Sequence, residues 1–193
     1  QQGLFVKYFG WRNDSNAYAY AGSRVVNRFN LYNDIYLHQI GGSTKMLTAA
    51  KRARDPEFSP DGSNLLVVTN AAQNNQLAQL TIDQQLNVHT NHSDHTQYST
   101  PRFSPDGNWI VASMWQQGQR DLWLLNPDGS PQLRLTNDLN MELEPRWDKE
   151  GHRIFFSSDR SGVYNIYALD LLTEQLYQVT NVLTGAFAPS PDE

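Results

Sequence analysis

The sequence predicts an all-β fold, a β-propeller built from four-stranded antiparallel blades, and three observations support this prediction. The pentapeptide FSPDG occurs twice, at residues 58–62 and 103–107, and an apolar run follows each copy. Related landmarks recur every 42 to 45 residues along the chain. Short stretches rich in β-branched and aromatic residues alternate with turn residues, which is typical of strands joined by hairpins. Tandem units of this length are typical of propeller blades.

Three landmarks define the repeat. The turn landmark falls at Ser59, Ser104, Asp148 and Ser190. The landmark of the third strand begins at Ile35, Leu77, Leu122 and Ile166. A pair of the Leu-Thr type closes each unit, at Leu47-Thr48, Val88-His89, Leu135-Thr136 and Val179-Thr180, and the second copy is degenerate.

The repeated Ser-Pro-Asp-Gly motif has the composition of a tight turn. Proline supplies the φ angle required at the second position of a type I turn, Asp tolerates the third position, and Gly adopts the left-handed conformation that closes a bulged hairpin. In the third copy, at residues 148–151, Asp-Lys-Glu-Gly takes its place. The motif therefore predicts the hairpin between the first and second strands of each blade, which we call strands A and B.

The repeat places four blades along the chain. We expect them at residues 4–48, 55–90, 100–136 and 144–180, followed by the start of a further blade at 182–193. Strand B is expected at 64–69, 109–114 and 153–158, and strand C at 76–82, 121–125 and 165–169. The first unit is the least regular, with strands expected at 4–10, 17–23, 33–40 and 44–48.

Blade faces are buried completely only when a propeller ring closes. We therefore expect the chain to be part of a larger ring of about six to eight blades. A closed four-bladed ring, or self-association of two chains that complete one ring, are the alternatives.

Composition excludes several classes of function. The chain has no cysteine, so it has neither disulfides nor thiolate metal sites. A net charge of -5 argues against a nucleic-acid partner. No apolar run reaches the roughly 20 residues that a membrane span needs. Charge is unevenly distributed, because residues 1–55 hold eight Lys or Arg and three Asp or Glu, whereas residues 56–193 hold seven and seventeen.

Motifs for catalysis are absent from the sequence, and one segment is rich in metal-ligand residue types. The sequence has no nucleophile elbow, phosphate-binding loop or zinc-protease helix motif, so we expect no enzymatic activity and no cofactor. The segment HTNHSDH is dense in imidazole and carboxylate groups that could bind zinc or copper. We interpret it as a solvated polar loop, and the weak metal-ligand candidates are His89, His92, Asp94 and His95.

The repeats at residues 55–69, 100–115 and 144–170 resemble those of TolB-like β-propellers, which also occur in tricorn-type and prolyl-oligopeptidase-type peptidases. The resemblance covers roughly residues 33–193. It implies a non-enzymatic scaffold that binds a protein or peptide partner in the cell envelope, in the periplasm of a Gram-negative bacterium, as part of a Tol transport system. Two alternatives remain, namely the extracytoplasmic sensor domain of a membrane-bound winged-helix transcriptional regulator and the gating propeller of a peptidase.

Recognition usually resides in variable loops on a rigid scaffold. The connectors from strand D to the next strand A, together with the hairpins between strands B and C, are such loops, and we expect them to share one face of the propeller. The partner-binding residues predicted there are Arg52, Arg54, His92, His95, Trp115, Asp138, Glu142 and Glu144.

Overall fold

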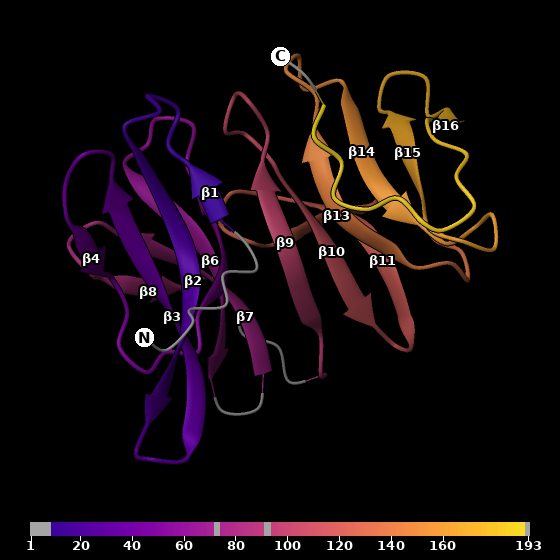
Figure 1. Ribbon diagram of the computed structural model, residues 1–193. Helices are drawn as coiled ribbons and strands as arrows, with labels where there is room; N and C mark the ends of the chain where they lie inside the picture. The colour runs from indigo at the N-terminus through magenta and orange to yellow at the C-terminus, as the bar shows by residue number, and fades with distance from the viewer. Residues whose placement is uncertain (1–8, 72–73, 91–93, 192–193) are drawn as a thin grey trace. The chain divides into compact units, whose positions relative to one another are not determined.

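The structure, a computed structural model, describes residues 9–71, 74–90 and 94–191. Its strands form four sheets of four antiparallel strands, and each sheet follows the chain order A, B, C, D (Figure 1). The predicted all-β fold with four propeller blades is therefore confirmed. Within the described ranges, no helix is long and apolar enough to span a membrane. The chain divides into two compact units, Gln1–His95 and Thr96–Glu193, which are described separately.

The first unit holds two blades. Blade 1 consists of β1 (Phe9–Trp11), β2 (Ala17–Val26), β3 (Asn30–Gln39) and β4 (Thr44–Met46). Blade 2 consists of β5 (Arg54–Phe58), β6 (Asn64–Ala71), β7 (Asn74–Thr81) and β8 (Leu86–Val88). The predicted start of strand A in blade 1, residues 4–8, lies outside the described residues.

The second unit holds two further blades. Blade 3 consists of β9 (Gln97–Phe103), β10 (Ile110–Gln116), β11 (Gln119–Leu125) and β12 (Pro131–Arg134). Blade 4 consists of β13 (Glu142–Trp147), β14 (Arg153–Ser158), β15 (Asn165–Asp170) and β16 (Leu176–Gln178). Residues 182–191, where the sequence predicts the start of a further blade, form no strand.

Each unit is held together by apolar side chains that alternate along the strands. In the first unit, small residues of β2 such as Ala19 pack with Ile35 of β3 and Leu65 of β6. Gly10 lies where β1 approaches blade 2, because a Cβ atom there would come within 2.7 Å of the Pro56 carbonyl oxygen. In the second unit, a cluster that includes Val111, Leu122, Ile154, Phe156 and Tyr167 forms the core.

The A-to-B turns have the predicted geometry. Gly62 and Gly107 have positive φ angles of 69° and 74°. The Ser104 hydroxyl accepts a hydrogen bond from the backbone N–H of Trp109, at 3.0 Å. In the third copy, the Asp148 carboxylate accepts the corresponding bond from Arg153, also at 3.0 Å. The replacement of Ser by Asp thus preserves the acceptor on which this turn depends.

A threonine closes each blade, and one prediction about it is wrong. In blade 1 the Thr48 hydroxyl accepts a hydrogen bond from the backbone N–H of Ile35 at 2.9 Å. The equivalent bond in blade 2 runs from Leu77 to Thr90 at 3.0 Å. Therefore Thr90, and not His89, is the counterpart of Thr48. The second copy is shifted by one residue rather than degenerate.

Strand A has the same irregularity in blades 2, 3 and 4. A residue with positive φ precedes a proline there, and these residues are Asp55, Thr100 and Glu144, while Ala188 stands in the same relation to Pro189 after blade 4. The strand pairing shifts at the first three of these positions, as expected for a β-bulge. Because the turn landmark follows this proline by three residues, the register favours Asp192 over Ser190 as its last copy.

Candidate partner-binding face

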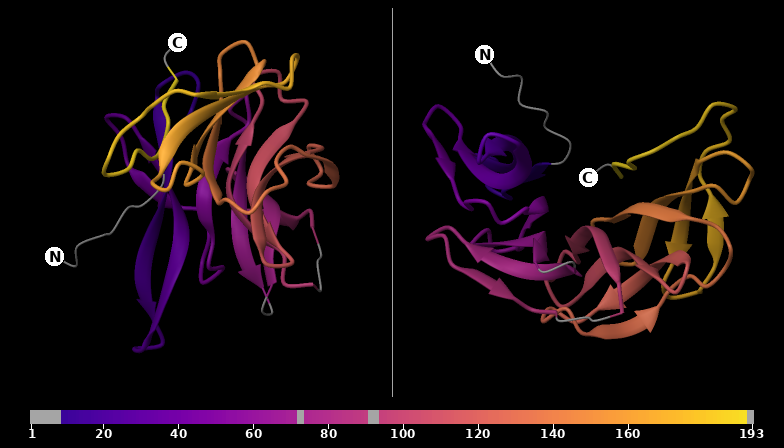
Figure 2. Two further views of the ribbon diagram at one scale, coloured as in Figure 1. Left: turned by 90° about the vertical axis from the view of Figure 1, so that its right-hand side faces the viewer. Right: turned by 90° about the horizontal axis from the view of Figure 1, so that it is seen from below.

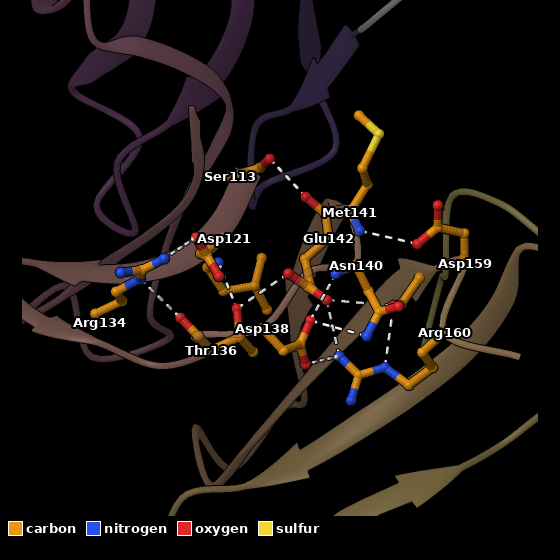
Figure 3. Close-up of polar contacts among 12 residues, drawn as sticks. Ser113, Asp121, Arg134, Thr136, Asp138, Asn140, Met141, Glu142, Asp159 and Arg160 are labelled. Atoms are coloured by element: carbon orange, nitrogen blue, oxygen red, sulfur yellow. Dashed lines mark hydrogen bonds and ion pairs between the residues drawn. The ribbon is translucent and has the colours of Figure 1, made fainter. Parts of the chain in front are cut away.

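The D-to-A connector between β12 and β13 meets the hairpin between β14 and β15. The backbone N–H of Met141 donates to the Asp159 carboxylate at 2.9 Å. The Tyr164 hydroxyl lies 3.7 Å from the Met141 sulfur. These contacts place a connector and a B-to-C hairpin side by side on one edge of the second unit, as the repeat predicts (Figure 3).

Arg160 and Glu142 form the centre of this polar network. The Arg160 guanidinium donates to Glu142 Oε1 at 2.8 Å and lies 3.4 Å from Asp138 Oδ2. Glu142 Oε2 accepts from the Thr136 hydroxyl at 3.2 Å, and Oε1 accepts from the Ser158 hydroxyl at 3.3 Å. The network therefore ties the connector to strands β13 and β14 of the following blade.

Glu142 is a fully buried carboxylate, with an exposed fraction of 0%. Burial raises its pKa from 4.5 to about 7, and the nearby Asp138 charge adds to this effect. Hydrogen bonds and the positive charge of Arg160 act in the opposite direction but do not cancel it. Glu142 thus changes its protonation near neutral pH while remaining enclosed by protein.

Two further side chains fix the ends of the connector. Arg134 donates to the buried Asp121 carboxylate at 2.6 Å and to the backbone carbonyl of Thr136 at 3.1 Å. The Ser113 hydroxyl donates to the backbone carbonyl of Glu142 at 2.7 Å. Together with Arg160 and Ser158 of blade 4, these two blade 3 side chains hold the connector from both blades of its unit.

The tip of this braced connector carries exposed apolar side chains. Leu139 is 91% exposed and Met141 is 41% exposed. Asp138 bends the chain between them by accepting from the backbone N–H and the side-chain amide of Asn140, at 2.8 and 2.9 Å. A rigid backbone therefore presents Leu139 to solvent beside carboxylates.

In the first unit, Asp34 holds the connector between β4 and β5. Its carboxylate accepts from the Thr48 hydroxyl at 2.9 Å and from the backbone N–H groups of Ala50 and Lys51 at 3.0 and 3.2 Å. Arg24 completes the set with an ion pair to Asp34 at 2.6 Å. Each unit thus uses a buried carboxylate to position a D-to-A connector.

The structure separates the predicted contact residues of the first unit. Arg52 is exposed and stacks over the Tyr32 ring, with 4.4 Å between the guanidinium carbon and the ring centroid. Arg54 lies in β5 and pairs with Asp55, which is buried. His95 is exposed and has a positive φ of 62°, whereas His92 lies outside the described residues. Arg52 and His95 therefore remain available to a partner.

In the second unit, Asp138 alone of the predicted residues belongs to the connector tip. Trp115 is half-buried within β10, opposite Arg120, so it is not part of a loop. Glu144 lies in β13 and accepts from the backbone N–H of Ala188 at 2.7 Å. The prediction of direct partner contact by Glu142 needs correction, because its burial leaves it the role of positioning Arg160.

The structure does not bring together those metal-ligand candidates that lie in its described residues. Within the described ranges, no group of three or more His, Cys, Asp or Glu side chains could hold a metal ion. His89 and His95 are both exposed, and His92 lies outside those ranges.

Two features of these loops are not predicted from the sequence. Arg160, in the hairpin between β14 and β15, joins Ser158, Glu142 and Asp138. Residues 24–26 and 30–32, which lie between the expected strands, continue β2 and β3. The spacing between the expected strands B and C, which is longer in blade 1 than in the other blades, could have indicated the second feature.

The fold defines a class of protein, the β-propeller module, and in each unit a buried carboxylate holds a connector between blades. Residues 56–190 match the family model of the TolB beta propeller domain, and the chain therefore belongs to this family. A Protein TolB homolog of Chlorobium luteolum is 29% identical over 142 residues, which are 70% of this chain and 30% of that protein. An uncharacterised protein of Agrobacterium fabrum is 25% identical over 129 residues, 67% of this chain and 44% of that protein. The chain thus spans less than half the length of both relatives.

Solved structures with the same fold include TolB proteins and a hydrolase. A candidate TolB of Agrobacterium tumefaciens superposes with a TM-score of 0.78 at 22% identity, covering 91% of this chain and 65% of that one. TolB of Acinetobacter baumannii superposes with a TM-score of 0.74 at 21% identity, covering 92% of this chain and 44% of that one. A puromycin hydrolase superposes with a TM-score of 0.74 at 12% identity, covering 95% of this chain and 32% of that one. At these identities the likeness shows the fold alone.

Proposed function

We propose that this chain is a non-enzymatic TolB-like scaffold that binds a protein or peptide partner through its D-to-A connectors and B-to-C hairpins. The observation that carries the proposal is the connector at residues 137–141, where Leu139 is 91% exposed on a backbone held by Asp138 and Asp159. Apolar anchors on a rigid support inside a polar rim are typical of protein interfaces.

The proposal includes the absence of catalysis. Among the described residues, Glu142 is the side chain whose raised pKa could suggest a catalytic role. A carboxyl group with a pKa near 7 is a candidate general base. Glu142, however, is fully buried, and its oxygens accept bonds from Arg160, Thr136 and Ser158. A substrate proton has no access to these oxygens, so we assign Glu142 a structural role.

Family membership supports the cellular context of the proposal. A TolB-like protein is expected in the periplasm of a Gram-negative bacterium, with a protein of the cell envelope as partner. A larger ring of about six to eight blades is part of the same proposal. The peptidase-propeller alternative has no separate support, because a likeness to puromycin hydrolase at 12% identity shows a shared fold and not a shared function. No comparison reported above supports the sensor-domain alternative.

Partner capture with two matched lysine variants tests the proposal. Leu139→Lys changes the connector tip, and Glu150→Lys places the same side chain on the exposed A-to-B turn of the same unit. Both proteins would be immobilised and exposed to an envelope extract of the organism that carries the gene. We expect Leu139→Lys to lose the captured partner and Glu150→Lys to retain it. Loss from Glu150→Lys alone would show that the opposite face binds.

A further inference from the structure

The B-to-C hairpin of blade 1 is longer than the other three. The equivalent residue pairs that bound these hairpins are Gly22 with Asp34, Thr69 with Gln76, Met114 with Asp121, and Ser158 with Asn165. Between the two members lie eleven residues in blade 1 and six residues in each of the other blades. We call the eleven residues 23–33 the arm.

The arm is a continuous two-stranded ribbon. Its strand pairing runs without interruption from Ser23 opposite Asn33 to Val26 opposite Asn30. In Figure 1 and in the left view of Figure 2, this indigo ribbon projects beyond the ends of β1 and β4 of its own blade. The extension is therefore ordered β-structure rather than an irregular loop.

The arm exposes large apolar side chains. Val25 and Leu31 face each other across the ribbon and are 48% and 68% exposed, and Phe29 in the turn is 91% exposed. Contiguous apolar groups on an extended element are unfavourable in water and usually mark an interaction site. The other blades form the same four-stranded sheet with hairpins that are five residues shorter, so these side chains are not required for a blade to fold.

The base of the arm is fixed to the neighbouring connector. Arg52 donates to the Tyr32 hydroxyl at 3.0 Å and stacks over the same ring. Arg24 pairs with Asp34, which also holds the backbone of Ala50. A partner that docks on the arm would therefore meet a preorganised surface, which reduces the entropy lost on binding.

The charges that remain on this surface are all positive. Asp34 neutralises Arg24, and Asp55 neutralises Arg54. Arg28, Lys51 and Arg52 have no carboxylate partner within the described part of the chain. An acidic occupant complements these three cations. A protein occupant follows from the proposed binding function, and an anionic membrane is an outcome of the test.

We propose that the arm docks an acidic segment of a protein partner that carries apolar side chains, with Phe29 as the central anchor and Arg28, Lys51 and Arg52 as the cationic rim. This inference rests on the proposed binding function and assigns the partner's chemistry. It concerns residues of the first unit only, so it can fail while the proposed role of Leu139 stands.

A phage-displayed library of random dodecapeptides, selected against the whole chain, supplies the probe. We expect enrichment of peptides with net negative charge and at least one large apolar residue. Binding of a labelled selected peptide would be measured by fluorescence anisotropy. Phe29→Ser should weaken binding about thirtyfold, the effect of losing an interface anchor. Arg28→Glu should weaken it about tenfold, and added salt should weaken binding to the unsubstituted protein.

Leu183→Ser is the matched control, because Leu183 is 92% exposed in the other unit and its loss should leave the affinity unchanged. Failure to enrich acidic peptides, or unchanged affinity in Phe29→Ser, would overturn the proposal. Peptides that lose affinity with Leu139→Lys but not with Phe29→Ser would support the proposed function while refuting the arm. Co-sedimentation with phosphatidylglycerol vesicles that depends on Phe29 would instead identify the arm as a membrane-binding element.

Discussion

Replacement of Glu142 by Gln should stabilise the protein increasingly as pH rises. The buried carboxyl of Glu142 has a pKa raised to about 7 in the folded protein, mainly by burial. Gln has nearly the same shape and cannot ionise. Its amide oxygen can accept from Arg160, and this preserves the main contact of the carboxyl group.

The magnitude follows from the pKa difference between the folded and unfolded states. Between an unfolded pKa near 4.5 and a folded pKa of about 7, the folded state binds more protons, so rising pH lowers the stability of the unsubstituted protein. One pKa unit corresponds to about 1.4 kcal/mol, which gives about 3 kcal/mol across this window. The Gln variant does not lose this unfolding free energy, so its unfolding free energy relative to that of the unsubstituted protein should rise by a similar amount from pH 4.5 to pH 8.

Urea unfolding followed by circular dichroism at a series of pH values would measure this difference. Glu150→Gln is the control for the loss of one negative charge, because Glu150 lies on an exposed turn of the same blade. A difference between Glu142→Gln and the unsubstituted protein that stays constant with pH would refute the reasoning. It would show that Arg160 compensates fully for the burial of the carboxylate.

Two other substitutions test the blade architecture. Thr180→Val removes the hydroxyl that accepts from the Ile166 N–H at 2.8 Å and donates to Asn165 at 3.0 Å, and should cost about 1 to 3 kcal/mol of unfolding free energy. Thr173→Val, at an exposed position of the same blade, should cost less, and equal losses would contradict the role of the closing threonine. Gly107→Ala should cost about 1 kcal/mol in the same urea assay because Gly107 has a φ of 74°, and an unchanged midpoint would contradict the turn assignment.

The sequence predicts strands B and C of blades 2 to 4 closely because turn residues bound them. β14 (Arg153–Ser158) coincides with its prediction, and β15 (Asn165–Asp170) is one residue longer. In blade 1 no Gly or Pro marks the turn at residues 27–29, and the arm was therefore not recognised. Local turn chemistry is readable from a single sequence, whereas a ribbon that continues without breaker residues is indicated only by the longer spacing between its expected strands.

The candidate site was predicted at the level of loops but not of side chains. Charged residues are expected to be exposed unless a partner compensates for their burial. The partner of Glu142 is Arg160, which follows eighteen residues later, and no sequence pattern links the two. For Thr90 the sequence does offer a signal, because Thr90 follows Leu77 by thirteen residues, as Thr48 follows Ile35, and the hydrogen bond from Leu77 confirms the match.

Site-specific photo-crosslinking tests the central claim, partner binding by the connector face, most directly. A benzoylphenylalanine side chain would replace Leu139 in one protein and Glu150 in another, and both would be irradiated in an envelope extract and analysed by mass spectrometry. We predict that one envelope protein crosslinks specifically to position 139 and not to position 150. Crosslinking of that protein to position 150 alone would contradict the account.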